Sequence, residues 1–341
     1  MILRGIDFGH VWQASGATNF YGEGHGAGHG WWYHKWLKPF GLDFRGSTFV
    51  AKTTTFLARA GNMPLKKDGV TPKELLPRCV HVNRKTKAAV NAVSLSGPGL
   101  SMLLVKGEWQ KRREPFFISL MSLADTPAKR QTELYMCVST LVRYKREFRA
   151  NFGVQANFSC PNGGVKPEDL ISEVKPCLDI LAELDVPIVA KFGPDLLVEA
   201  ALEIEKHEAL DGFCVFNTIP WDKLPDNEKV KYFGSTTSPL VKHFGEKFKG
   251  GVSGIPLLSR LCEWIFAARK AGLQKPINAG GGILCGNDVR DVVRSGADSI
   301  SLGSIAFLAP TKVKEAIRAG NHYCEIATGL RNEASFIGLI G

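Results

Sequence analysis

Residues 152–162 of the chain read FGVQANFSCPN, a β-prone run that ends in polar side chains. We predict a strand at Val154–Ser159 and a helix at Pro167–Leu184 directly after it. Pro167 suits the first position of a helix, and Glu168 and Asp169 place negative charge in its first turn, where the helix dipole favours it. A strand followed at once by a helix is the repeating unit of parallel α/β proteins.

Other β-rich runs flank this unit on both sides, and most precede helix-like segments such as Ala128–Arg149 and Pro256–Ala271. These runs are Val11–Ser15, Phe49–Thr53, Phe116–Met121, Pro187–Phe192, Gly212–Asn217, Pro276–Gly280 and Ser299–Leu302. Several are almost continuously apolar, as is typical of parallel strands that helices cover. Strands that alternate with helices in this number predict an α/β fold, the (β/α)8 TIM barrel. A doubly wound sheet is the alternative, but the early GxGxxG usual there is absent.

The second and third predicted strands are separated by extra material, residues 54–115. Val80–Val90 is suited to a small hairpin within it. No low-complexity linker divides the chain, so we expect one domain over residues 1–341. The most biased stretch, Gly22–Gly30, is rich in glycine and histidine and is too short for an interdomain spacer, so we predict a loop.

The composition is that of a folded protein with an excess of basic residues. Apolar residues make up 44% and charged residues 22% of the 341 positions, which excludes a disordered chain. The 43 basic and 33 acidic residues give a formal charge of +10. Such an excess suits an anionic ligand, RNA or an acidic membrane surface, and it equally suits a solvated basic surface.

The cysteines are scattered and none forms a CxxC pair, which argues against a zinc ribbon, an iron–sulfur ligand set or a secreted disulfide scaffold. They are Cys79, Cys137, Cys160, Cys177, Cys214, Cys262, Cys285 and Cys324. Charged residues interrupt the N-terminus where a signal peptide needs an apolar stretch, and no window is long and apolar enough for a membrane span. We therefore expect a cytoplasmic protein with reduced thiols and no membrane partner.

Polar and small residues follow the predicted strands, where TIM barrels carry their catalytic groups. They are Ala14–Gly16, Lys52–Thr55, Asn157–Asn162, Lys191, Asn217–Thr218, Gly280–Gly282 and Gly303–Ser304, and a small-residue loop is predicted at Gly250–Gly254. Asparagine carboxamides offer a donor and an acceptor, so several of them can read the edge of a flat amide ring. A cysteine beside them can move a proton.

Each of these features alone also has an ordinary structural explanation. Most buried cysteines are inert core residues, a glycine run is more often a turn than a phosphate site, and a lone lysine often extends its amine to solvent. Their joint occurrence at successive strand ends favours a binding site. The glycines near Gly281 and Gly303 suit the phosphate site that barrels form after strands seven and eight.

These residues together resemble the dihydroorotate dehydrogenase family of FMN-dependent TIM barrels. The resemblance runs from about Ala14 to about Phe307, and the stretch Asn157–Asn162 is its most specific part. Further pieces occur in the family's order, namely Ala14–Gly16, Phe49–Thr55, Pro77–Arg78, Asn91, Lys191, Asn217–Thr218, Gly251–Gly254, Gly281–Gly282 and Gly303–Ser304.

The resemblance implies a role for each matching residue. Cys160 is expected to be the base that takes a proton from a substrate carbon while hydride passes to flavin N5. Residues expected to hold the substrate ring are Lys52, Asn91, Leu95, Asn157, Asn162, Asn217 and Thr218. Residues expected to bind FMN are Ala14, Ser15, Gly16, Lys52, Asn157, Lys191, Ser253, Gly254, Gly281, Gly282, Gly303 and Ser304.

With a cysteine as the expected base, the chain resembles the soluble class of the family. A serine base marks the membrane-associated, quinone-linked class. The resemblance implies oxidation of dihydroorotate to orotate in pyrimidine biosynthesis. It leaves the electron acceptor open between fumarate and a partner subunit that carries FAD and an iron–sulfur cluster. Soluble members are commonly homodimers, so a homodimer is expected.

Two segments depart from the family pattern. Ser94 and Gly97 stand where the family usually has a glycine and an asparagine, so a related dihydropyrimidine or cyclic amide is an alternative substrate. His25, His29 and His34 lie in or beside the glycine-rich loop, which offers no helical face to align them on a metal. We predict no metal site, and we expect a flap anchored by Trp31 and Trp32 instead.

Two other functions fit the same residues. A tRNA dihydrouridine synthase-like flavoenzyme would use the basic charge and a catalytic cysteine, but such enzymes carry an extra helical RNA-binding domain after the barrel, and the sequence ends soon after Phe307. We therefore favour no nucleic-acid partner. A non-catalytic flavin-binding barrel is the third hypothesis, although nothing structural requires Cys160 and the asparagines together.

Overall fold

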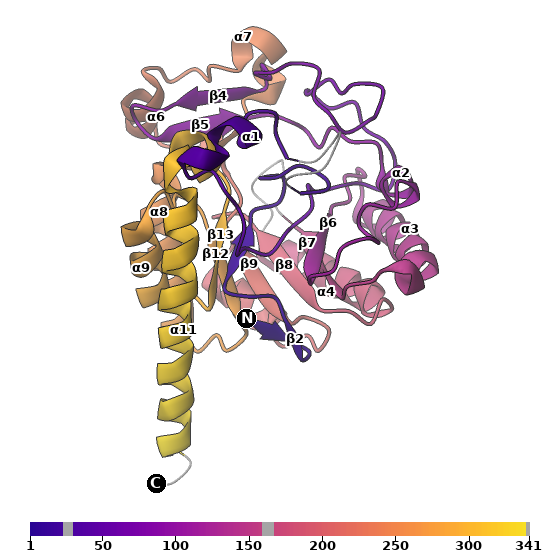
Figure 1. The fold of residues 1–341 in the computed structure, drawn as a ribbon, viewed down its shortest axis with the longest axis vertical. Helices are drawn as coiled ribbons and strands as arrows, with labels where there is room; N and C mark the ends of the chain where they lie inside the picture. The colour runs from indigo at the N-terminus through magenta and orange to yellow at the C-terminus, as the bar shows by residue number, and fades with distance from the viewer. Residues whose placement is uncertain (23–29, 159–166, 339–341) are drawn as a thin grey trace.

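The protein, in a computed structural model, forms a barrel of parallel strands surrounded by helices (Figure 1). The structure describes residues 1–22, 30–158 and 167–338. Hydrogen bonding joins the strands in the order β3, β13, β12, β9, β8, β7 and β6. Their bounds are β3 Val11–Gln13, β6 Phe116–Leu120, β7 Phe152–Asn157, β8 Ile188–Phe192, β9 Gly212–Val215, β12 Ile277–Gly280 and β13 Ser299–Leu302.

The predicted strand Phe49–Thr53 closes this sheet into a barrel, although it pairs through single bridges and forms no continuous ladder. Thr48 bridges Trp12 of β3, whereas Val50 and Thr54 bridge Phe117 and Leu120 of β6, all in parallel. The chain therefore joins the two edge strands, and no doubly wound sheet forms. The predicted TIM barrel is confirmed, and the other predicted strands lie within two or three residues of the observed ones.

Helices cover the outside of the barrel and bury its apolar outer face. They include α2 Leu100–Val105, α3 Pro127–Tyr144, α4 Pro167–Ala182, α5 Val198–Ile204, α8 Leu258–Lys270, α9 Gly286–Arg294 and α11 Val313–Gly338. The α3 helix begins at Thr126, whose side chain accepts a hydrogen bond from the Lys129 N–H. Leu134, Val138 and Leu141, on one face of α3, are buried against the sheet, as the helical spacing predicts.

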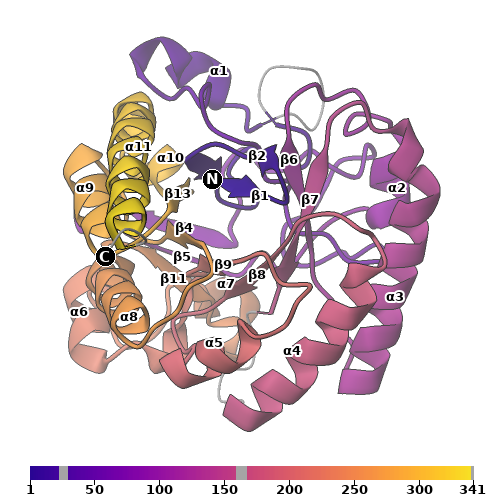
Figure 2. The same cartoon turned by 90° about the horizontal axis from the view of Figure 1, so that it is seen from below.

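The amino-terminal end of the barrel is closed by an apolar plug. Strands β1 (Ile2–Leu3) and β2 (Ile6–Asp7) form a small hairpin that lies in the middle of the ring of strands (Figure 2). Phe8 follows the hairpin and packs on Phe117 and Trp12, with ring centroids 4.3 and 6.3 Å apart. Val50 and Val189 complete this cluster, which is separate from the main core. Water is thus excluded from one end of the barrel, and the site must open at the other.

A second sheet lies over the carboxyl end of the barrel, with four antiparallel strands in the order β10, β11, β5 and β4. The predicted hairpin at Val80–Val90 is present as β4 Val80–Asn83 and β5 Ala88–Asn91. The expectation of a loop at Gly250–Gly254 was wrong, because Gly251–Gly254 forms strand β11 between β5 and β10 Ile219–Pro220. Its partners are distant in sequence, which is why local composition indicated a loop.

The last helix, α11, packs against α9 and then extends away from the barrel beyond its amino-terminal end (Figure 1). The shorter helices are α1 His34–Leu37, α6 Asp226–Phe233, α7 Val241–Phe244 and α10 Ile305–Leu308. Among the described residues no helix combines the length and apolarity needed to cross a lipid bilayer.

Candidate active site

A polar layer lies inside the barrel above the apolar plug. The Cys214 thiol lies 3.4 Å from both Gln155 Nε2 and Asn278 Oδ1, and Ser301 also donates to Asn278 Oδ1. On the opposite strands Thr53 Oγ1 lies 2.8 Å from Ser15 Oγ and 2.9 Å from Ser119 Oγ, and these three side chains form a second set. Such polar side chains are costly in a barrel interior, so their presence marks this end as the functional one.

Two buried lysines reach this layer from opposite sides of the barrel. Lys52 follows the second strand and Lys191 lies in β8, and both side chains are nearly inaccessible to solvent. Burial lowers the pKa of Lys191 and lowers that of Lys52 to about 7, because the charged amine loses its hydration. Neither lysine has a carboxylate partner among the described residues. A buried cation without a counter-ion favours an anionic ligand.

Lys52 is held by contacts that sequence reasoning did not find. Its Nζ donates to the Ser96 carbonyl and lies 4.6 Å from the centroid of the Phe20 ring, a cation–π contact. Gly16, with φ of +88°, lies against its aliphatic chain, and the Trp31 indole donates to the Gly16 carbonyl. Residues Ala14–Gly16 and Lys52 therefore meet, as predicted. The Trp32 indole donates to the Leu75 carbonyl, and the flap that these tryptophans were expected to anchor stays a prediction, since residues 23–29 lie outside the described part of the chain.

The predicted ring-binding side chains Asn91 and Thr218 meet at β11. Asn91 ends β5, and its Nδ2 lies 3.5 Å from the Gly251 carbonyl. A Cβ at Gly251 would lie 2.1 Å from Thr218 Oγ1, so only glycine fits there. Asn217 Oδ1 accepts from the Thr218 N–H, and the Asn217 N–H bonds to Phe192, next to Lys191. Asn91 at the end of β5 and Asn217–Thr218 between β9 and β10 thus converge from two segments over the carboxyl end.

Asn157 and Lys191 are register partners on adjacent parallel strands, β7 and β8. The Phe158 N–H also bonds to the Lys191 carbonyl, which continues the pairing to the end of the strand. Gln155, two residues before Asn157, is almost completely buried, and its Oε1 has no hydrogen-bond partner in the part of the chain that the structure describes. A buried acceptor of this kind can pair with a donor group of a ligand.

The predicted phosphate-binding glycines bring three backbone segments together. A Cβ at Gly282 would lie 2.7 Å from the Leu258 N, at the start of α8, and 3.0 Å from the Gly254 carbonyl. Ser253 and Gly254 end β11, and Gly281 lies against Leu257. Gly303 lies against Ala14, and Ser304 precedes α10. The start of a helix beside closely packed glycines suits a phosphate.

Some predicted residues are not placed at the site by direct contacts. Cys160 and Asn162 lie outside the described residues. Leu95 is half-buried and has φ of +55°, and Ser94 before it has φ of +56°. Left-handed backbone is strained for both side chains. A glycine at position 94, as the family has, would relieve this strain, and nothing in the structure explains the serine found there.

Sequence reasoning missed Phe20, Ser96, Gln155, Asn278 and the structural role of Cys214. Gln155 and Asn278 left a signal, since each is a polar residue within a strand whose residues are all buried; Asn278 is the one polar side chain of β12, and β7 also carries Asn157. Phe20 and Ser96 left none, because their importance comes from contacts with Lys52 across 32 and 44 positions of sequence.

The donor set fits a flavin. Lys191 and the free Gln155 acceptor suit the polar edge of an isoalloxazine, and the Gly254–Gly282 region suits a phosphate. No group of histidine, cysteine and acidic side chains suited to a metal exists among the described residues. A parallel barrel with buried lysines and converging amides at its carboxyl end defines the class, a TIM-barrel protein with a polar ligand site at that end.

The family profile of dihydroorotate dehydrogenase matches residues 45–321, so the chain belongs to the dihydroorotate dehydrogenase family. It is accordingly an oxidoreductase of the type that acts on CH–CH bonds. The catalytic subunit of dihydroorotate dehydrogenase B (NAD+) from Staphylococcus carnosus is 24% identical over 82% of this chain and 83% of its own length. Dihydroorotate dehydrogenase A (fumarate) from Lacticaseibacillus paracasei is 25% identical over 85% of this chain and 86% of its own length.

A quinone-type relative matches about as well. The dihydroorotate dehydrogenase (quinone) of Halorhodospira halophila is 27% identical over 68% of this chain and 67% of its own length. Among solved structures, the DHODH of Eimeria tenella in complex with ferulenol superposes with a TM-score of 0.62, at 18% identity over 93% of this chain and 82% of its own. This likeness supports the fold. The relatives differ in electron acceptor, so the acceptor of this chain stays a prediction.

Proposed function

We propose that this chain binds FMN and oxidises dihydroorotate, or a closely related dihydropyrimidine, to the unsaturated ring. The observation that carries the proposal is the pair of buried lysines, Lys52 and Lys191, which have no carboxylate partner in the described chain. A reduced flavin and a substrate carboxylate are both anionic, and each would supply the missing counter-charge.

The substrate ring would lie between Asn91, Asn157, Asn217 and Thr218. Their carboxamides and hydroxyl can pair with the N–H and C=O groups of a cyclic amide, which orients the ring. Lys52 would then face the ring carboxylate and Lys191 the flavin. Ser253, Gly254, Gly281, Gly282, Gly303 and Ser304 would hold the flavin phosphate.

Cys160 would take a proton from one ring carbon; the electron pair of that C–H bond forms the new C=C bond as the neighbouring carbon releases its hydrogen as hydride. Bound FMN supplies the acceptor for that hydride. The thiol must first lose its own proton, and a cation nearby lowers a thiol's pKa. The ring amides would also hold the reacting carbon beside the sulfur, which is the geometric requirement for proton transfer.

Anaerobic mixing of the purified protein with dihydroorotate, followed in the visible spectrum, tests this function. Bleaching of an oxidised-flavin band would support both cofactor and substrate. If the protein is yellow but keeps its colour, dihydroorotate is not its substrate. The substrate would then be another ring, whose identity the segment Asn91–Gly97 would determine. A colourless protein that takes up no FMN would reject the proposal.

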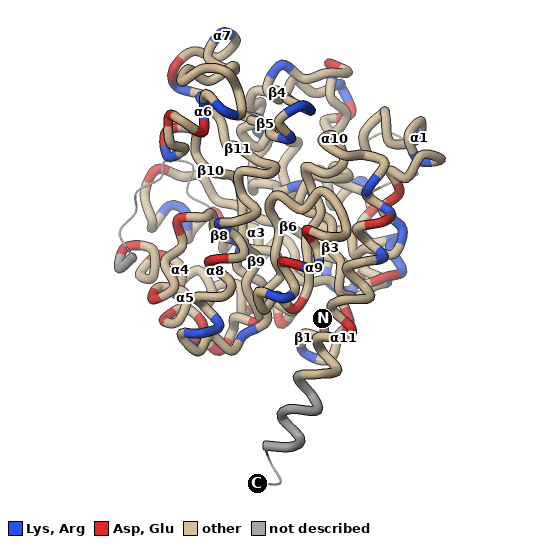
Figure 3. The backbone as a smooth tube through the Cα atoms, turned by 90° about the vertical axis from the view of Figure 1, so that its left-hand side faces the viewer, with Lys and Arg blue, Asp and Glu red and all other residues tan. Residues whose placement is uncertain are grey.

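The basic net charge does not by itself favour RNA. Figure 3 shows Lys and Arg mixed with Asp and Glu over the side of the molecule in view, without a face of one sign. Many cations of the described chain are also paired, such as Arg130 with Glu173 and Arg260 with Glu228. RNA binding that weakens steeply with salt would revive the dihydrouridine synthase-like alternative.

A further inference from the structure

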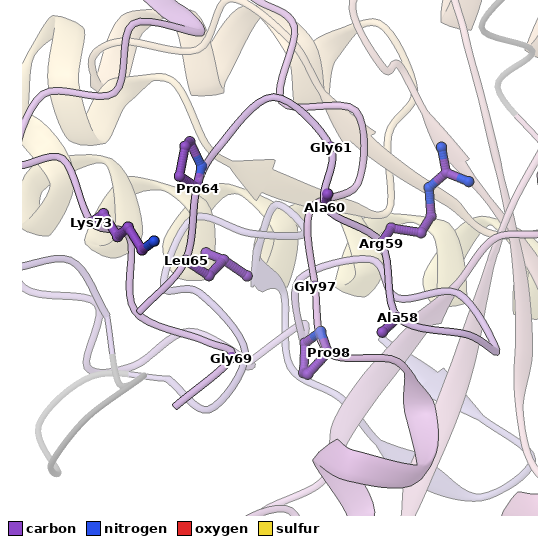
Figure 4. A pocket seen from close by; sticks show the side chains of 10 residues that line it. All are labelled: Ala58, Arg59, Ala60, Gly61, Pro64, Leu65, Gly69, Lys73, Gly97 and Pro98. Carbon is purple, nitrogen blue, oxygen red and sulfur yellow. The ribbon is translucent and has the colours of Figure 1, made fainter. Parts of the chain in front are cut away.

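A cavity lies in the segment inserted between the second and third strands of the barrel. Its volume is about 440 Å³, and residues 58–73 and 97–98 form its walls (Figure 4). Arg59 and Gly97 join the two walls, because each N–H donates to the other's carbonyl, at 2.8 and 2.9 Å. A volume of this size can hold a small organic molecule.

The lining combines an apolar body with positive charge. Figure 4 shows Pro64, Leu65 and Lys73 on one side, with the Lys73 side chain extending toward Leu65. Arg59 lies on the other side, and its guanidinium is directed away from the labelled group. No acidic residue lines the cavity. The lining therefore suits a molecule that is apolar at one end and anionic at the other.

Exposed cations lie in and beside the lining of this cavity without ion pairs to other described residues. Lys66 and Lys67 belong to the same segment as Arg59 and Lys73, and Asp68 is its one acidic residue between positions 58 and 73. None of these four cations has an ion pair within the described residues, whereas Arg269, for example, is paired with Asp298. Unpaired cations around a cavity attract an anion.

One wall of the cavity also holds Lys52. Gly97 lines the cavity, and the residue before it, Ser96, accepts the Lys52 hydrogen bond through its carbonyl. Ser96 Oγ in turn accepts from the Met63 N–H at 3.0 Å. Gly61, on the facing wall, is so close that a Cβ there would lie 2.2 Å from Ser96 Oγ. A molecule that moves either wall must therefore move the peptide that holds Lys52.

We propose that this cavity is a second ligand site for a small organic anion with an apolar body, anchored by Lys73, and that its occupation alters Lys52 through Ser96. The ligand-binding part is independent of the proposed function. The regulatory part rests on it, since Lys52 is there assigned to the substrate site.

Calorimetric titration of the FMN-loaded protein with naphthalene-2-sulfonate tests the site. Ala60→Trp fills the cavity without changing charge, and Lys73→Ala removes the anchor. We expect saturable binding to the wild type, at least tenfold weaker binding to Lys73→Ala, and none to Ala60→Trp. Lys270→Ala, at an exposed lysine of α8, is the matched control and should bind as the wild type does. Equal affinity of all four proteins would overturn the site.

The coupling is tested by the rate at which acetic anhydride modifies Lys52, mapped by mass spectrometry with and without the sulfonate. We expect the rate to change at least threefold in the wild type and to stay constant in Ala60→Trp, with Lys270 as internal reference. An unchanged rate at Lys52 in the wild type would overturn the coupling. Neither measurement uses dihydroorotate, so a failure of the proposed function would be seen separately.

Discussion

At the scale of single residues, Lys52 is an ionisable side chain of the proposed site that the barrel shields from water. Its amine donates to the Ser96 carbonyl, lies over the Phe20 ring and has no carboxylate partner in the described chain. Holding a proton on this amine therefore carries an electrostatic cost, which an anionic ligand would offset and loss of the proton would remove. Because burial lowers the pKa of Lys52, the free energy of unfolding should also depend on pH.

The burial of Lys52 predicts a stability that rises with pH above neutrality. The folded-state pKa is about 7 and the ordinary value is 10.5. Between these values the unfolded chain holds a proton that the folded protein lacks, so the free energy of unfolding increases with pH. Relative to Lys52→Met, the wild type should gain on the order of 4 kcal/mol across this window. Urea unfolding from about pH 6 to about pH 10 measures it. A constant difference between the two proteins would refute the burial argument.

Replacement of Cys160 tests the proposed base. Cys160→Ala should slow flavin reduction by dihydroorotate by roughly 10² to 10⁴-fold, since a general base contributes about that much. FMN stoichiometry should stay the same, because the thiol would act on the substrate. Stopped-flow absorbance under anaerobic conditions gives the rate. Cys262→Ala, a half-buried cysteine on α8, is the control; a full rate in Cys160→Ala would remove the assigned role.

At the scale of elements, β11 connects the two sheets of the molecule. It pairs with β5 and β10, and its last residue, Gly254, lies beside Gly282 and the start of α8. The proposed ring site and the proposed phosphate site are thus held at the two ends of one short strand. A substitution in β11 should therefore affect ligand binding at both sites.

Gly254→Ala should weaken FMN binding and destabilise the fold. A Cβ there would lie 2.3 Å from the Lys87 carbonyl, in addition to the strain of φ +96°. Gly272→Ala is the matched control, with φ of +100° and open space around it. We expect a loss of about 1 kcal/mol for Gly272→Ala from backbone strain and at least about 3 kcal/mol for Gly254→Ala. Thermal unfolding and FMN titration measure both effects, and equal losses would mean that the contact with Lys87 relaxes freely.

At the scale of the whole molecule, the barrel is closed at one end by apolar side chains and carries its polar groups at the other. The plug around Phe8, Trp12 and Phe117 shares no residue with the proposed site. Stability and chemistry are therefore separated along the barrel axis. This division predicts that the plug can be weakened without loss of the site.

Phe8→Ala should lower the free energy of unfolding by about 3 to 5 kcal/mol, the usual cost of a cavity in place of a buried phenylalanine. FMN affinity of the folded protein should stay within a factor of two of the wild type. Phe40→Ala, at an exposed ring, is the control and should change stability by less than about 0.5 kcal/mol. Urea unfolding and FMN titration below the transition test the separation; a loss of FMN affinity parallel to the loss of stability would contradict it.

The sequence by itself determined the barrel, because strand and helix periodicities are local: seven predicted strands match observed ones, and Phe49–Thr53 joins the barrel through isolated bridges. It also predicted Lys52, Asn157 and Lys191 at the ends of barrel strands, since a strand's carboxyl end follows from its direction along the chain, whereas Asn91 was expected from the family resemblance alone. The role of Cys160 stays a prediction from the motif.

Only the tertiary structure decided the rest. β11 became a strand because β5, distant in sequence, pairs with it. Phe20 and Ser96 gained their importance from Lys52, and the two walls of the cavity, residues 58–73 and 97–98, are joined by hydrogen bonds between Arg59 and Gly97. Contacts of this kind form between segments whose local patterns carry no information about each other, so packing alone selects the partner.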